Sequence, residues 1–336
     1  MIAADKITLI ACANIDRLTT VEMRRSDYSR GVIAHLHEAA KAAQGDQPLS
    51  LLGARFMEKV VQPGRVVLIT TGAGNRDYLP AGETDGPPGA VILARLVAML
   101  GGVPILLTEA DYVDNVEKTA LAAGLGLRNP EAARRLAFTT AVLPLSNGDD
   151  AEAEAEELLT RFDPTALISI EKLGPNHAGI AHSSSGGVAD DSRARAEYLF
   201  DIGAARGIPS LGIGDNGNEL GFGKILEAVH RYKPNGERLG TRVTTDVLIP
   251  ANCSNWGASA IAAALAILRD DPRFLHSAED EQRIITACVD AHGADGSTGR
   301  HILEVDGMPM KVQMAVMDML QGIVRNALIR GYKRPF

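Results

Sequence analysis

The stretch Glu83-Thr84-Asp85-Gly86-Pro87-Pro88-Gly89 sets two carboxylates beside a turn made of glycine and proline. Residues 66–71, ahead of it, are apolar or β-branched throughout, which predicts a buried strand. Residues 90–100, after it, carry the pattern of an apolar helix. Because proline fixes the dihedral angle φ and glycine admits conformations closed to other residues, we expect Glu83 and Asp85 to be held rigidly at the start of this helix. Ligands of open α/β sheets bind at such strand-to-helix connections.

Strands and helices alternate along the chain on both sides of this stretch. Further strands are predicted at 103–107, in the last part of 134–144, and at 165–170, 210–213 and 243–249. Helices are predicted at 32–44, 51–61, 112–123, 149–160, 192–206, 220–230, 252–268, 279–291 and 310–330, with a short hairpin at 301–310. Residues 1–30 have no clear pattern. The alternation predicts one α/β domain over residues 1–336, with a largely parallel sheet and a helical last third.

The composition narrows the classes of function. The 336 residues are 46% hydrophobic but only 4% aromatic, and the formal net charge is −8. Nucleic-acid binding is therefore not expected, because it needs basic surfaces and often stacking aromatics. The three cysteines, Cys12, Cys253 and Cys288, are too few and too scattered for a disulfide framework or a zinc site, which suits a reducing cytoplasm. The apolar run at 7–13 is too short for a signal peptide or a membrane span.

Acidic side chains follow three of the predicted strands. Glu83 and Asp85 follow the first, Glu171 ends the strand at 165–170, and Asp215 and Glu219 follow the strand at 210–213. In a parallel sheet these groups converge at one edge, where they repel one another unless protons or a cation neutralise them. Oxygen ligands of this kind suit Mg²⁺, Mn²⁺ or Ca²⁺ better than zinc. The alternative interpretation is that each carboxylate caps a helix or a turn.

The segment 212–217 formally matches the dinucleotide fingerprint GxGxxG between a strand and a helix. However, Asp215 within it and Glu219 just after it would repel a pyrophosphate at the helix N-terminus. We therefore expect the glycines, Gly214 among them, to allow a close approach of the backbone to a small ligand, or to fit Asp215 into a cramped turn.

The loop 173–191 is rich in glycine, serine and histidine. His177 or His182 could act as a general base, and N–H groups near Ser184 could form a nest for a substrate carboxylate. A serine nucleophile is disfavoured because no GxSxG elbow is present. The alternative is a solvated surface loop. Lys172, directly after Glu171, suits an electrophile or a carboxylate anchor, or else an ordinary ion pair.

A polar turn at 252–255 precedes the helix that ends near residue 268. Cys253 in this turn could be a stabilised thiolate, but a small buried cysteine is the plainer interpretation. Asn255 is a good helix-capping residue and a candidate for substrate binding. Trp256, the only tryptophan, is expected to form a wall of the site or part of the core.

Four segments together resemble the C-terminal domain of D-glutamate cyclase: residues 83–90, 214–224, 254–257 and 304–309. They occur in the family's order, and the resemblance covers about residue 15 to the end. It implies a Rossmann-like three-layer α/β fold, a divalent metal ion, and conversion of D-glutamate to 5-oxo-D-proline and water. The acidic positions shared with the family are the five named above, with Asn218 beside them. Two loops, 74–78 and 172–187, depart from the family's pattern, so the resemblance says less about the substrate than about the fold.

These observations give one working hypothesis, a metal-assisted lyase or cyclase acting on a small amino-acid-like carboxylate. Mn²⁺ or Mg²⁺ is held by some of Glu83, Asp85, Asp215 and Glu219. A proton is moved by Glu171 or His182, and a second carboxylate is held by Arg76 or Lys172. The remaining expected substrate contacts come from Thr84, Gly86, His177, Ser184, Gly214, Asn218 and Asn255.

Two alternatives remain open: a metal-dependent hydrolase of a lactam or cyclic imide, and a metabolite-binding module without chemistry. The expected partner is a small carboxylate or lactam, and the long C-terminal helix suits a homodimer on base rates alone.

Overall fold

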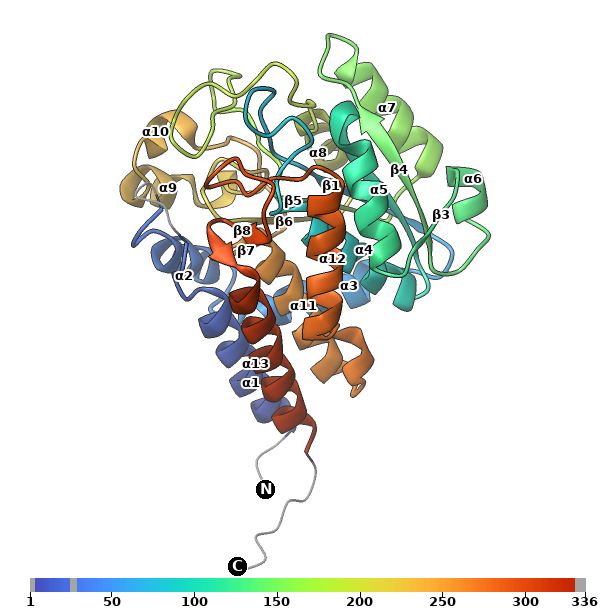
Figure 1. Ribbon diagram of the computed structural model, residues 1–336, viewed down its shortest axis with the longest axis vertical. Helices are drawn as coiled ribbons and strands as arrows, with labels where there is room; N and C mark the ends of the chain where they lie inside the picture. The colour runs from blue at the N-terminus through green and yellow to red at the C-terminus, as the bar shows by residue number, and fades with distance from the viewer. Residues whose placement is uncertain (1–3, 25–28, 330–336) are drawn as a thin grey trace, which may run out of the picture.

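The computed structural model describes residues 4–24 and 29–329, and its central element is a parallel β-sheet (Figure 1). The strand order is β3-β4-β2-β1-β5-β6-β7, and every neighbouring pair is parallel. The strands are β1 Val66–Thr71, β2 Val103–Glu109, β3 Gly126–Leu127, β4 Thr139–Leu145, β5 Ala166–Ile170, β6 Ser210–Gly214 and β7 Val247–Pro250. The α/β class and the largely parallel sheet are therefore confirmed.

The order of the strands decides where a ligand can bind. Without the two-residue edge strand β3, the chain visits the six remaining strands in the doubly wound order of Rossmann folds. The winding reverses between β1 and β5, which lie next to each other. At such a switch point the connections after the two strands diverge and leave a crevice at the carboxyl edge. Here these connections are the loops 72–86 and 171–196.

Helices cover both faces of the sheet, as expected for a three-layer fold. On one face α4 (Pro87–Met99), α11 (Ser254–Leu268) and α3 (Leu49–Val60) share a core with alternate residues of β1, Val67 and Ile69. On the other face α7 (Ala151–Phe162) and α8 (Glu197–Ala205) share a core with Val66 and Leu68. The side chains of a strand alternate between the two faces, so both must be apolar in a doubly covered sheet.

Helix α11 is buried on all sides except at its last residue, Leu268. It lies between the sheet and an outer pair of helices, α1 (Ala4–Thr19) and α13 (Met310–Leu328), which run side by side in the lower part of Figure 1. Six alanines and a glycine in α11 allow these close approaches. The other elements are α2 Ile33–Ala43, α5 Val113–Ala122, α6 Pro130–Ala133, α9 Leu226–Tyr232, α10 Gly236–Leu239, α12 Ala278–Asp290, the 3₁₀ turns at 110–112, 223–225 and 272–274, and the hairpin β8 Glu304–Val305 and β9 Met308–Pro309.

Several predicted boundaries are wrong for local reasons. The helix predicted at 192–206 begins only at Glu197, because the Asp190 side chain accepts the Ser192 N–H and folds that segment into a turn. The helix predicted at 220–230 is a 3₁₀ turn followed by α9, because Gly221 has a φ of +114°. Residues 4–19, without a clear pattern in the sequence, form α1. In the described part of the chain, no helix combines the length and the apolar character needed to cross a membrane.

Candidate active site

Six carboxylates gather at the carboxyl edge of the sheet, around the switch point. Five of them have exposed fractions of 9% or less, and the side chain of the sixth, Asp306, is 14% exposed. One oxygen each from Asp85, Glu171 and Asp215 lie within 4.8 Å of one another. The predicted convergence of the strand-end acids is therefore present in the fold. The six are Glu83, Asp85, Glu171, Asp215, Glu219 and Asp306, hereafter the acid cluster.

Asp85 and Asn255 hold two helix N-termini together in a reciprocal arrangement. The Asp85 carboxylate accepts the N–H groups of Ser254 (2.8 Å) and Asn255 (2.9 Å), the first residues of α11. The Asn255 side-chain oxygen accepts the N–H groups of Gly86 (3.0 Å) and Gly89 (2.8 Å) at the start of α4, and its amide donates to the Thr84 carbonyl (2.9 Å). Both helix dipoles thus point their positive ends at the acid cluster. Asn255 is a clamp on the loop, and its predicted contact with substrate remains a prediction.

Glu171 occupies a strained position at the end of β5. Its φ is +45°, unusual for a residue with a side chain. The Ser254 hydroxyl donates to its carboxylate at 2.5 Å. Gly86, with a φ of +97°, passes so close that an added Cβ would lie 2.8 Å from the Glu171 Cβ. The glycine therefore lets the loop 72–86 pack directly against Glu171.

The turn after β6 is folded around Glu219. Its carboxylate accepts the backbone N–H groups of Asp215 (3.2 Å), Asn216 (2.9 Å) and Gly217 (2.8 Å). A Cβ on Gly214 would lie 2.9 Å from the Glu219 side chain. The glycines of the GxGxxG match thus serve close packing, and the N–H groups that a pyrophosphate would need are already bonded. The same bonds limit the number of Glu219 lone pairs left for a metal ion, which remains a prediction for this residue.

Arg24 and Lys233 are the cations next to the acid cluster, and sequence reasoning missed both. Arg24 forms ion pairs with Asp215 (2.6 Å) and Asp306 (3.4 Å), and it also donates to the Asp215 carbonyl (3.1 Å). The Lys233 ammonium donates to the side-chain oxygens of Asn216 (2.7 Å) and Ser29 (3.1 Å). Among the residues that the structure describes, only these two positive charges thus lie next to the six carboxylates.

The excess of negative charge raises the pKa values of the acids. Burial, followed by repulsion from Asp215, raises the pKa of Asp85 to about 7 and that of Glu219 to about 7. Burial and the neighbouring carboxylates raise the pKa values of Glu83, Glu171 and Asp306 well above their ordinary range. Without a further cation, the cluster therefore keeps protons at neutral pH.

This charge imbalance predicts how stability depends on pH. Asp85 and Glu219 have folded pKa values of about 7, above their ordinary values of 3.8 and 4.5, so the folded state binds more protons between these limits. The free energy of unfolding therefore falls as pH rises through this window. We expect the melting temperature in EDTA to be at least about 3 °C higher at pH 5.5 than at pH 8. The difference should shrink in Asp215→Asn; an equal difference in both proteins would contradict the assignment.

Four other predicted site residues do not belong to the acid cluster. Lys172 is fully buried and pairs with Glu109 at the end of β2, so it does not act as a partner of Glu171. The Arg76 guanidinium is half exposed and pairs with Asp191 (2.7 Å). His177 lies exposed in the loop after β5, and Ser184 is half-buried there. Their roles in substrate binding remain predictions.

His182 and Asn218 keep unused polar atoms in the interior. The Asn218 amide donates to the His182 carbonyl (2.8 Å), while the Asn218 side-chain oxygen and the His182 Nδ1 are buried without a hydrogen-bond partner among the described residues. Burial lowers the pKa of His182, which keeps its ring neutral. The Thr84 hydroxyl, by contrast, already donates its proton to the Glu304 carbonyl (2.7 Å), and its predicted contact with substrate remains a prediction. Asn218 thus remains the better candidate for contacting a bound molecule.

The residues present fit a divalent cation. The donor set consists of carboxylate oxygens, the ligands that Mg²⁺ and Mn²⁺ prefer, and raised pKa values mark the charge that such an ion would neutralise. The buried Thr71 hydroxyl, beside Gly86, lacks a partner among the described residues. A second group, Asp85, Cys253 and Asp306, offers a thiol as well. Glu171, expected as a catalytic base, therefore lies among the closest candidate ligands.

Residues 22–321 match the family described as D-glutamate cyclase-like, C-terminal. The chain belongs to this family. The human protein named D-glutamate cyclase, mitochondrial, is 33% identical over 220 residues, which are 61% of this chain. These residues are 33% of the human protein, so the chain spans about a third of that relative's length. That name places the relative in mitochondria, so a cytoplasmic location for this chain stays a prediction.

Proposed function

We propose that this D-glutamate cyclase-like protein converts D-glutamate to 5-oxo-D-proline and water at the acid cluster, with a divalent cation. One observation carries the proposal: in a chain of this family, buried carboxylates converge on the switch point, and the described residues supply too few cations to balance them. Such an arrangement is costly for stability unless it binds something.

The proposed reaction balances without any other reactant. The substrate nitrogen attacks the carbon of the side-chain carboxylate, a C–N bond forms and one C–O bond breaks. Two of the three ammonium protons leave with the departing oxygen as water. The chain must therefore move protons from nitrogen to oxygen, which suits a carboxylate whose pKa is raised into the neutral range or above.

Glu171 is the residue best suited to carry those protons. It borders the switch-point crevice, burial raises its pKa, and the Ser254 hydroxyl holds one of its oxygens. The unpaired side-chain oxygen of Asn218 is suited to accept an N–H of the substrate. Asp85 and Asp215 would hold the cation with Glu171 beside them, and a bound cation would polarise the carboxylate under attack.

We assign to Arg24 the role that was expected of Arg76 or Lys172, which is to hold the second carboxylate of the substrate. Because Arg76 and Lys172 are paired elsewhere, Arg24 is the guanidinium at the cluster, among the described residues, that can hold the second substrate carboxylate. Before ligands bind, the same group neutralises Asp215.

This double role of Arg24 makes a testable prediction. Arg24→Gln frees Asp215 from its ion pair, so we expect Mn²⁺ to bind about tenfold tighter, as measured by electron paramagnetic resonance of free Mn²⁺. The KM for D-glutamate should rise about tenfold in the same variant, because the carboxylate anchor is lost. Arg65→Gln is the control, since Arg65 forms an exposed pair with Asp163 far from the cluster. Unchanged Mn²⁺ affinity in Arg24→Gln would remove Arg24 from this role.

Product analysis from both sides tests the direction of the reaction. The protein is incubated with Mn²⁺ and either D-glutamate or 5-oxo-D-proline, and the two compounds are separated by chiral chromatography. We expect D-glutamate to be consumed and 5-oxo-D-proline to form. Rapid opening of 5-oxo-D-proline with no detectable cyclisation would favour the lactam hydrolase instead. No conversion from either side, together with tight binding, would favour a metabolite-binding module.

A further inference from the structure

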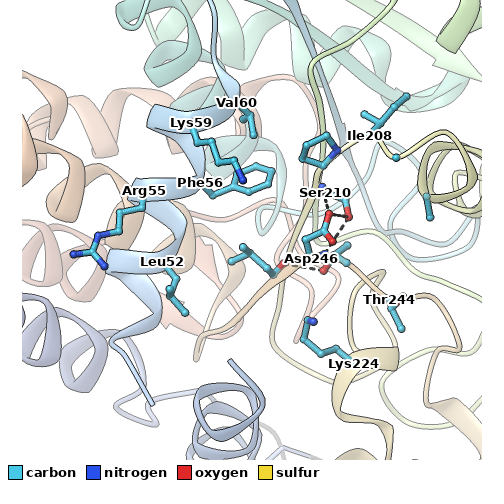
Figure 2. Close-up of a pocket in the computed structure, with 15 residues that line it drawn as sticks. Leu52, Arg55, Phe56, Lys59, Val60, Ile208, Ser210, Lys224, Thr244 and Asp246 are labelled. Carbon is cyan, nitrogen blue, oxygen red and sulfur yellow. Dashed lines mark hydrogen bonds between the residues drawn. The ribbon is translucent and has the colours of Figure 1, made fainter. Parts of the chain in front are cut away.

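A hollow of about 750 Å³ lies at the amino edge of the sheet, opposite the acid cluster (Figure 2). It is bounded by α3, by the turn that leads into β6, and by the segments at 224 and 244–247. Strand β6 begins in its wall at Ser210 and ends just before Asp215, so the length of the strand separates the hollow from the acid cluster. A ligand here would contact none of the groups in the proposed reaction.

Two lysines face this hollow from different elements. Figure 2 shows the ammonium groups of Lys59, from α3, and Lys224, from the 3₁₀ turn at 223–225, pointing into it, whereas the guanidinium of Arg55 points away. Asp246 is the acidic residue in the lining, and its carboxylate accepts the Ser210 N–H (2.8 Å) and hydroxyl (3.3 Å). The hollow therefore has a surplus of positive charge in a chain whose net charge is −8.

Neither lysine has a partner in the part of the chain that the structure describes. No hydrogen bond or ion pair joins the ammonium group of Lys59 or Lys224 to any other described residue. Acids do match some other surface cations, as in Lys118–Asp114 and Arg161–Glu131, whereas the surface lysines Lys41 and Lys311 have no such partner among the described residues. Lys59 and Lys224 differ from those lysines because both point into one hollow. In an acidic protein, two unmatched cations that point into one hollow indicate an anion-binding site.

The rest of the lining is largely apolar. Phe56 and Val60 are buried in α3, and Figure 2 shows the Phe56 ring beside Lys59. Leu52, Ile208, Pro209 and Val247 are partly exposed to the hollow, and the exposed Thr244 adds a hydroxyl. A ligand that matches these walls has an apolar body and an anionic end.

We propose that this hollow binds a small phosphate monoester with an apolar or aromatic body. Two ammonium groups match the two negative charges of a phosphate monoester, and Lys binds phosphate as a point charge. A carboxylate is less well matched, because no guanidinium fork faces the hollow. The body of the ligand lies against the partly exposed apolar residues of the wall, Leu52, Ile208 and Val247.

Isothermal titration calorimetry with phenyl phosphate tests this site on the 336-residue chain in EDTA. We expect a dissociation constant below about 1 mM, and binding at least about fivefold tighter than that of inorganic phosphate, because the ring buries apolar surface. Lys59→Ala combined with Lys224→Ala should weaken phenyl phosphate at least tenfold. Arg55→Ala is the matched control: it removes one positive charge from the same helix, but its side chain points away, so affinity should stay within about twofold.

Each outcome decides a part of the proposal. No binding of phenyl phosphate to the wild type at 10 mM, or unchanged affinity in the folded double lysine variant, would overturn the site. If inorganic phosphate bound as tightly as phenyl phosphate, the proposal that the ligand has an apolar body would be wrong. If Arg55→Ala weakened phenyl phosphate as much as the double lysine variant does, the binding would reflect non-specific surface charge. Saturating Mn²⁺ should leave the affinity unchanged, which separates this site from the acid cluster.

Discussion

Asp215→Asn is expected to lower kcat/KM for D-glutamate at least about 1,000-fold while the protein stays folded. Asp215 lies within 4.8 Å of oxygens from both Asp85 and Glu171, so it is central to the closest candidate ligand set. An amide has the size of the carboxylate but lacks its charge, so a divalent cation loses a strong ligand. The fold should not suffer, because neutralising Asp215 relieves its repulsion of Asp85, Glu171 and Glu219. The buried Arg24 loses its ion pair with Asp215 but keeps the one with Asp306 (3.4 Å). The melting temperature in EDTA should stay equal or rise.

The matched control for this variant is Asp114→Asn. Asp114 is exposed on α5 and pairs with Lys118, so the same chemical change is made far from the cluster. Its kcat/KM should stay within about twofold of the wild type. Full activity in Asp215→Asn, with Mn²⁺ affinity unchanged, would show that the acid cluster is not the metal site.

Gly86→Ala is expected to have the second largest effect. The new Cβ would lie 2.8 Å from the Glu171 Cβ and 3.0 Å from the Thr71 hydroxyl, at a φ of +97°. The positive φ alone costs about 1–2 kcal/mol, and the close contact should bring the loss of stability to about 2–4 kcal/mol. Displacing Glu171 by a fraction of an ångström or more should lower kcat about 100-fold. Chemical denaturation and initial rates measure the two effects separately.

Gly124→Ala separates backbone strain from contact with Glu171. Gly124 also has a positive φ, +84°, but no atom lies within 4 Å of an added Cβ. This variant should lose about 1–2 kcal/mol of stability and keep its activity within about twofold. If Gly86→Ala behaved in the same way, the approach of the loop 72–86 to Glu171 would have no part in catalysis.

The sequence predicted the part of the site that follows the strands. The β-branched run at 66–71, the acidic loop and the apolar helix pattern are local signals, and β1, Asp85 and α4 occur where these signals place them. Glu171 and Asp215 were predicted because they follow strands, and the carboxyl ends of parallel strands meet at one edge of the sheet. The order of the strands, and hence the switch point between β1 and β5, depends on long-range pairing that a local pattern does not encode.

The residues that the sequence did not predict lie outside the loops that follow the strands. Arg24 follows α1, Asp306 lies in the turn of the β8–β9 hairpin, and Lys233 follows α9, so none of them ends a strand of the sheet. They reach the cluster only through tertiary packing. Lys172 illustrates the same limit, since its ion pair with the buried Glu109 at the end of strand β2 is a long-range contact that the sequence does not show. The positive φ of Glu171 also has no signal in the sequence, because the residue type disfavours that conformation.

Metal-dependent cyclisation of D-glutamate is tested most directly by proton nuclear magnetic resonance of the protein incubated with D-glutamate and Mn²⁺. L-glutamate is run in a parallel tube, and the metal is removed before each spectrum. We expect 5-oxoproline signals to grow from D-glutamate only, to vanish with EDTA, and to fall to background in Asp215→Asn. Formation of 5-oxoproline at full rate in EDTA would contradict the metal site. No product from D-glutamate with Mn²⁺ present would contradict the proposed reaction itself.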